Sequence, residues 1–154
     1  MDNVAKRRHY ASEHMRLYAC LLLAMDELVR ESDGKTDDKS VEHTMSDRLE
    51  PQNFDLVVKA ALKCSLPVMD DFDDLKSPSN AIKLKYDIRR LENAKYTFLL
   101  KEDEPNKEEM KKCKRFLKLM DLEWSERVTK VANTVVQKLQ LEASYLAALY
   151  RLVA

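Results

Sequence analysis

A single glycine, Gly34, occurs among the 154 residues of this chain. Phosphate-binding loops of the P-loop and dinucleotide types need several glycines, because the backbone must approach phosphate where a Cβ would clash. KH modules need a Gly-x-x-Gly clamp and RRM motifs also carry glycines, so the sequence excludes these folds too. Sheet-rich folds use glycine in tight hairpin turns, which are missing here. The sequence therefore favours a fold made of helices.

The composition agrees with this conclusion. Hydrophobic residues make up 45% of the chain and charged residues 35%, and 27 basic residues balance 27 acidic ones. This mixture is typical of a soluble domain of amphipathic helices. One domain is expected at this length, with no membrane-spanning segment, because the longest apolar run covers only residues 17–25.

The three cysteines are Cys20, Cys64 and Cys113. Their odd number and wide spacing argue against a zinc finger and against a disulfide framework, so we expect a reducing compartment and thiols buried on helix faces. The basic runs at residues 6–8 and 111–115 are patterns of nuclear import, which favours the nucleus over the cytoplasm.

Apolar residues recur at spacings of three and four along most of the chain, which predicts helices. The predicted helices cover about residues 4–31, from Pro51 to Pro67, from Ser77 to about Leu100, and 106–140. The apolar residues 141–153 either fold back as a fifth helix or dock on a partner. We predict an all-α fold of four to five helices, one of them long and in the C-terminal half, with orthogonal or bundle-like packing.

The predicted organisation has three parts. Residues 1–31 form an N-terminal helix, the polar residues 32–48 form a flexible linker, and residues 49–154 form a helical domain. In the third helix, one apolar face is expected to point inward, and it consists of Ala81, Leu84, Ile88, Leu91 and Phe98. Trp124 lies on the apolar stripe of the long helix, where we expect it to be a core residue.

Neither a metal centre nor a catalytic motif is found in the sequence. The histidines are His9, His14 and His43, and no Glu-x-x-His pair accompanies them. A calcium loop starting at Asp70 would need a glutamate at its twelfth position, which is Ala81. We therefore expect a protein without catalytic activity, metal or cofactor.

Basic side chains cluster on the two predicted helices around residues 77–100 and 106–140. Two neighbouring cationic stripes suit contact with the phosphate backbone of duplex DNA. The alternative is that they are solubilising faces, which the zero net charge favours on pattern alone. The candidate DNA-binding residues are Lys83, Lys85, Arg89, Arg90, Lys111, Lys112, Lys114, Arg115 and Lys118.

Three stretches carry a resemblance to a known family. They are residues 49–60 (LEPQNFDLVVKA), residues 75–85 (LKSPSNAIKLK), and residues 116–124, where Phe116 begins a run that ends at Trp124. Their order resembles the helical segment of transposon-derived animal proteins that carry a tyrosine-recombinase-like domain. The resemblance covers about residues 46–140, and the arginine, His-x-x-Arg and tyrosine set of the catalytic domain is not found.

The resemblance implies a non-catalytic helical module, similar to the core-binding region of a tyrosine recombinase, that binds duplex DNA through its phosphates. A protein–protein interaction module is the alternative. In that case a homodimer would form, or the helix of a partner would bind, through Tyr145, Leu146, Leu149 and Tyr150.

Overall fold

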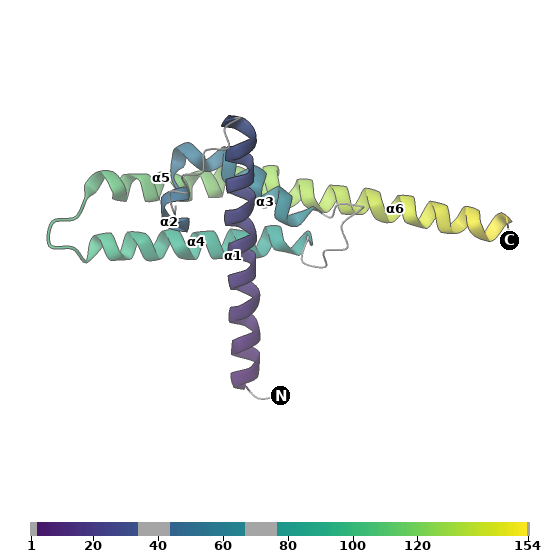
Figure 1. Ribbon diagram of the computed structural model, residues 1–154, viewed down its shortest axis with the longest axis horizontal. Coiled ribbons are helices and arrows are strands. Elements are labelled where there is room, and N and C mark those ends of the chain that lie inside the picture. The colour runs from purple at the N-terminus through teal and green to yellow at the C-terminus, as the bar shows by residue number, and fades with distance from the viewer. Residues whose placement is uncertain (1–2, 34–43, 67–76, 154) are drawn as a thin grey trace.

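The computed structural model describes residues 3–33, 44–66 and 77–153, and within these ranges it contains helices and no strand (Figure 1). The all-α prediction is confirmed, as is the bundle-like packing with one long helix in the C-terminal half. The elements are α1 (Asn3–Asp33), α2 (Met45–Arg48), the short turn η1 (Pro51–Asn53), α3 (Phe54–Ser65), α4 (Ser79–Leu100), α5 (Lys107–Trp124), the π-helical turn η2 (Ser125–Thr129) and α6 (Lys130–Val153).

Helix α1 crosses the rest of the molecule at a steep angle (Figure 1). Its most extensive contacts are with α3, and it also touches α4. Leu17, Leu21 and Met25, spaced one turn apart, are buried at this crossing, whereas the N-terminal turns of α1 are exposed. The predicted helix over residues 4–31 is therefore present, and only its middle and C-terminal part pack on the body.

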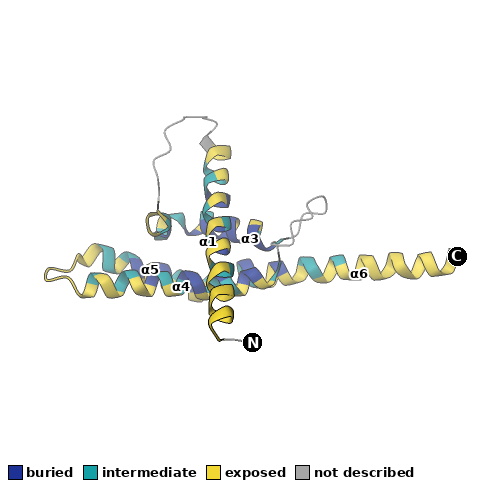
Figure 2. Cartoon of the chain, turned by 60° about the horizontal axis from the view of Figure 1, so that its bottom comes forward, coloured by how far each residue is buried: buried dark blue, intermediate teal, exposed yellow. Residues whose placement is uncertain are grey.

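Helices α4 and α5 lie side by side and antiparallel, joined by a short turn (Figure 1). Asn106 ends that turn and caps α5 by accepting a hydrogen bond from the Glu109 N–H at 3.3 Å. Between the two helices and α3, the core buries Leu84, Ile88 and Trp124 completely. Dark blue segments in Figure 2 show that this core lies where α1, α3, α4 and α5 meet.

The predicted linker covers residues 32–48, and of these residues 34–43 lie outside the described part of the chain. At its end the prediction is wrong, because Met45–Arg48 form the short helix α2. Thr44 and Asp47 stabilise this helix with a capping box, and Met45 packs against the core. An ion pair of 2.7 Å between Arg48 and Asp26 also ties it to α1.

Helix α3 begins three residues after Pro51, because residues 51–53 form a tighter turn first. It ends at Ser65, and Leu66 has the extended backbone that a residue preceding proline favours. The predicted Asp-rich loop at residues 70–74 lies outside the described residues.

Helix α4 begins at Ser79, one residue later than Ser77–Pro78 predicted, and the Ser77 Oγ accepts a hydrogen bond from the Ser79 N–H. The prediction that Phe98 points inward is wrong, since 73% of its surface is exposed. Phe98 has the right spacing, but it lies in the last turns of α4, beyond the part of the helix that the core covers.

The long helix does not end near residue 140 or fold back. Helices α5 and α6 are continuous through η2, and together they form one helix of 47 residues. Phe116, Met120, Trp124, Val128 and Ala132 are buried at a constant interval of four residues. In a regular α-helix this row would turn away from the core, and the wider π turn keeps Val128 and Ala132 on the buried side.

Candidate functional site

Four of the nine candidate DNA-binding cations are held in ion pairs. Lys83 pairs with Glu13 of α1, and Arg89 pairs with Asp121 of α5. Lys111 lies 3.2 Å from Glu108, and Lys112 lies 3.1 Å from Glu109. Two of these pairs therefore connect helices within the fold, and two are local pairs at the start of α5. Lys112 also lies 3.8 Å from Glu50, which precedes η1.

The other candidate cations lie on the two helices α4 and α5. On α4, Lys85 is half-buried and Arg90 is exposed. On α5, the Lys114 ammonium lies over the Tyr96 ring, 5.4 Å from its centre, and Arg115 and Lys118 are exposed. We call the exposed side of α5 formed by Lys111, Lys114, Arg115 and Lys118 the cation row, because these four positions share one face of the helix.

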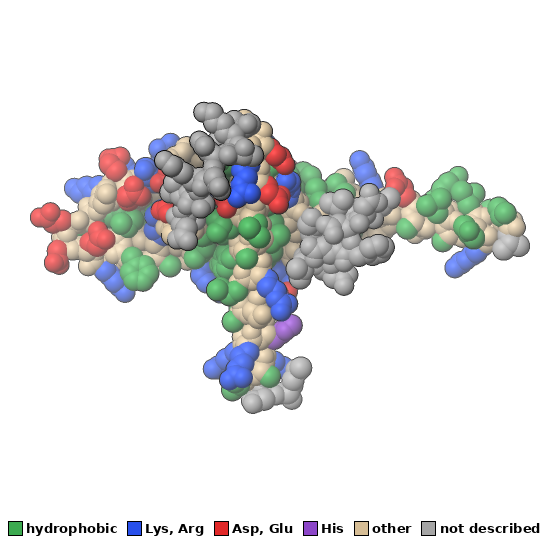
Figure 3. Space-filling model, in the orientation of Figure 1, with side chains coloured by type: hydrophobic (Ala, Val, Ile, Leu, Met, Phe, Trp, Pro, Cys, Tyr) green, Lys and Arg blue, Asp and Glu red, His purple; other side chains and the backbone are tan. Residues whose placement is uncertain are grey.

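The C-terminal half of α6, residues 141–153, is exposed along its whole length (Figure 2). We call this segment the apolar tip, and Figure 3 shows its hydrophobic side chains gathered at the far end of the molecule. Only Glu142 and Arg151 are charged within it. The exposed large apolar side chains are Leu141, Tyr145, Leu146, Leu149, Tyr150, Leu152 and Val153, with exposures from 40% to 86%.

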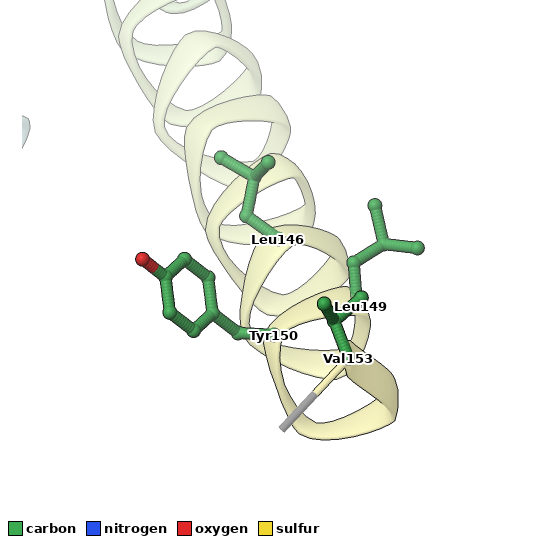
Figure 4. Close-up of a pocket in the computed structure, with 4 residues that line it drawn as sticks. All are labelled: Leu146, Leu149, Tyr150 and Val153. Atoms are coloured by element: carbon green, nitrogen blue, oxygen red, sulfur yellow. The ribbon is translucent and has the colours of Figure 1, made fainter.

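The side chains of the apolar tip project from several sides of the helix. Leu146, Leu149, Tyr150 and Val153 line an open and mostly apolar surface hollow (Figure 4). A helix that is apolar on all sides is ordinarily buried inside a protein or an assembly. The residues proposed from the sequence for a partner contact thus lie on one accessible segment, and they are Tyr145, Leu146, Leu149 and Tyr150.

Besides the candidate cations, a polar cluster lies where α1 crosses α4. The Nδ1 atom of His14 is 2.5 Å from the Oδ2 atom of Asp87, which is 1% exposed. The Tyr18 hydroxyl donates to the main-chain carbonyl of Asp87 at 3.0 Å, and Tyr10 packs on the His14 ring. Burial raises the pKa of Tyr18 to about 12, and the negative charge of Asp87 adds to the rise. These contacts fix α1 on α4.

A third polar feature lies between α4 and α5, where Glu92 is 1% exposed and its Oε2 atom has no hydrogen-bond partner among the described side chains. Burial raises the pKa of Glu92 to about 7, although Lys95 and the Cys113 thiol oppose the rise. Burial, followed by the charge of Glu92, raises the pKa of Cys113 to about 11. A raised pKa keeps the Cys113 thiol protonated, and the thiolate is the reactive form of cysteine.

A fourth feature is a sulfur pair between α1 and α3. The Sγ atoms of Cys20 and Cys64 lie 2.8 Å apart, although the two residues are 44 positions apart in the chain. Within the described ranges, no group of three or more His, Cys, Asp or Glu side chains is arranged to hold a metal ion.

None of the features that bring distant residues together could be read from the sequence. The pairs His14–Asp87, Glu92–Cys113 and Cys20–Cys64 each join two helices. Periodicity shows which residues of one helix share a face, but it does not show which two faces meet. The apolar tip is different, because its composition alone distinguishes it.

The comparisons with known proteins identify no relative of this chain. No family model matches it, no curated protein matches it, and no solved structure matches it. In the described part of the chain, no helix combines the length and the apolar character needed to cross a membrane.

Proposed function

We propose that this protein is a helical interaction module that forms a homodimer through the apolar tip of α6. The observation that carries the proposal is the exposure of seven large apolar side chains on thirteen consecutive residues that extend away from the body (Figure 3). Contiguous exposed apolar surface of this kind marks an interaction site in soluble proteins, because removing it from water is favourable.

The spacing within α6 suits a contact between two helices. Apolar residues recur at alternating intervals of three and four, which is the repeat of a two-helix seam. The seam consists of Val136, Leu139, Ala143, Leu146, Tyr150 and Val153. Val136 and Leu139 are half-buried, and a partner helix would extend the face that begins with them.

The charges of the tip favour a second copy in antiparallel orientation. Glu142 lies near one end of the tip and Arg151 near the other. In an antiparallel pair, Glu142 of one copy and Arg151 of the other lie at the same level along the axis, whereas a parallel pair places like charges level with each other. Opposite charges at one level support association, and like charges oppose it.

Sedimentation equilibrium of the full chain tests this proposal. The wild type is expected to be a dimer at micromolar concentration, and Leu146→Glu combined with Tyr150→Glu is expected to be a monomer. Leu122→Glu is the matched control, because Leu122 on α5 is 64% exposed and Leu146 is 61% exposed. A monomeric wild type, or equal dissociation of the control, would contradict the proposal. Circular dichroism checks that each variant remains helical.

The cation row supports duplex DNA binding as a second candidate function. Three of its members, Lys114, Arg115 and Lys118, make no ion pair with the described residues, and the pair of Lys111 with Glu108 is mostly exposed. Four cations on one face suit contact with consecutive phosphates, which would give a slope of log affinity against log salt of roughly −3 to −4.

Fluorescence anisotropy with a labelled duplex tests this second candidate. Replacing the four residues of the cation row with glutamate is expected to abolish binding. Replacing Lys59, Lys63, Lys130 and Lys138 with glutamate is the control, since it changes the net charge equally on other surfaces. Equal losses in the two variants would show that only the overall charge matters, and unchanged affinity of the first variant would exclude the cation row.

A further inference from the structure

The contact between Cys20 and Cys64 is closer than packing of two thiols requires. Their Sγ atoms lie 2.8 Å apart, within about 1 Å of the length of a covalent S–S bond. Cys20 is on α1 and Cys64 is on α3, so the two sulfurs meet at the crossing where α1 makes its most extensive contacts with the body. The fold therefore holds both sulfurs in place for a bond that would need little movement.

We propose that Cys20 and Cys64 are an oxidation site at which a peroxide converts two thiols into a disulfide that joins α1 to α3. This inference is independent of the apolar tip and of the cation row. It also differs from what the spacing of the cysteines indicates, because positions so far apart in sequence give no sign that two of them meet.

The difference in exposure of the two thiols sets the order of the steps. Cys20 is half-buried, whereas Cys64 is 0% exposed. A peroxide therefore reaches Cys20 first, since oxidation of cysteine follows access as well as thiolate character. Cys64 lies behind it and acts as the resolving thiol.

The reaction balances with hydrogen peroxide as the oxidant. The Cys20 sulfur attacks one peroxide oxygen, the O–O bond breaks, and the products are a sulfenic acid and one water molecule. The Cys64 sulfur then attacks the Cys20 sulfur, the S–O bond breaks, and the hydroxyl leaves as a second water molecule with the thiol proton. Overall, two thiols lose two electrons and two protons to the peroxide, and a thiol reductant reverses the change by exchange.

Cys113 provides an internal comparison in the same chain. It is 1% exposed, and its thiol contacts Glu92 between α4 and α5, not another cysteine. A disulfide that includes Cys113 would require the core to open. Selective formation of the Cys20–Cys64 link, with Cys113 still reduced, therefore reports on the folded arrangement and not on general reactivity.

The test is peroxide treatment of the purified full chain, followed by intact-mass measurement and peptide mapping without reduction. The expected product is a chain that is lighter by two hydrogen atoms and has no covalent link to another chain, with a Cys20–Cys64 peptide link that a thiol reductant removes. Cys113→Ser is expected to form the link as the wild type does, and Cys20→Ser and Cys64→Ser are expected to form none.

A second arm separates geometry from reactivity. In a denaturant that unfolds the chain, the preference for the Cys20–Cys64 link over links to Cys113 is expected to fall at least several-fold. The proposal is overturned if the folded chain accumulates sulfinic acid without a link, forms links between chains only, or links Cys113 as readily as Cys64.

Discussion

The indole N–H of Trp124 donates a hydrogen bond of 3.1 Å to the main-chain carbonyl of Ala81, which joins the end of α5 to the first turn of α4. Both residues are 0% exposed. The bond satisfies the only polar atom of the indole inside the core and fixes the register of the two helices. The expectation that Trp124 is a core residue is confirmed by its burial.

Replacing Trp124 with phenylalanine is expected to lower the free energy of unfolding by about 2 kcal/mol, because the variant loses both the buried hydrogen bond and part of the packed ring. Urea denaturation followed by circular dichroism measures the loss. Phe98→Leu is the control, and it should change stability by less than about 0.5 kcal/mol, since Phe98 is 73% exposed. A wild-type stability for Trp124→Phe would show that the bond contributes nothing.

The ionisation of Glu92 is expected to make the folded state less stable as pH rises. Its pKa is about 7 in the folded state, above the ordinary value of 4.5, so the folded state binds the proton more tightly than the unfolded state does. The contribution of Glu92 to the free energy of unfolding is therefore fully present below about pH 4.5. The free energy of unfolding then falls by up to about 3 kcal/mol as pH rises to about 7. Above that pH the loss is constant.

Glu92→Gln tests this pH dependence, because the amide has the shape of the acid and does not ionise. Chemical denaturation between pH 4 and 8 is expected to show a smaller fall in stability for Glu92→Gln than for the wild type. Glu104→Gln is the control at an exposed position of the α4–α5 turn. Parallel curves for the wild type and Glu92→Gln would contradict the prediction.

The contact between His14 and Asp87 is expected to be strongly coupled. A double-mutant cycle with His14→Ala and Asp87→Ala should give a coupling energy of about 2 kcal/mol, because Asp87 is buried and removing His14 deprives it of a partner. The same cycle for Glu108 and Lys111, both largely exposed, should give less than about 0.5 kcal/mol. Equal coupling in the two cycles would show that burial does not matter.

Oxidation at Cys20 and Cys64 is expected to raise the thermal stability of the chain. The link would close a loop between residues 44 positions apart, which restricts the unfolded state and raises the melting temperature by roughly 10 °C. Differential scanning calorimetry of the oxidised and reduced chains measures the shift. Cys113→Ser should show the same rise and Cys20→Ser none. A fall in melting temperature on linking would indicate a strained arrangement.

The helices were predictable because their apolar residues follow a regular period. Leu17, Leu21 and Met25 lie on one predicted face and are buried together. Phe98 has the same spacing yet is exposed, because periodicity indicates a face and not how far along it a neighbouring helix extends. The tight turn at 51–53 also escaped prediction, since a proline suits the first turn of either kind of helix.

The candidate sites were predictable to different extents. The apolar tip was identified as residues 141–153, but the sequence left open whether it folds back, and only the structure shows that α6 continues outward. The nine cations were identified by pattern, but the ion partners of Lys83 and Arg89 lie on other helices. Tertiary contacts of this kind depend on how helices cross, which residue spacing does not determine.

The π turn at Ser125–Thr129 has a consequence for the distant end of the chain. Because α5, η2 and α6 form one rod, winding this turn as a regular α-helix without removing a residue would rotate everything beyond it by roughly 100° about the rod axis. Leu146, about 27 Å further along the helix than Val128, would then point in another direction without any change in its own sequence. The orientation of the outer end of the rod is thus set inside the core, by the one turn that is wound differently from the rest.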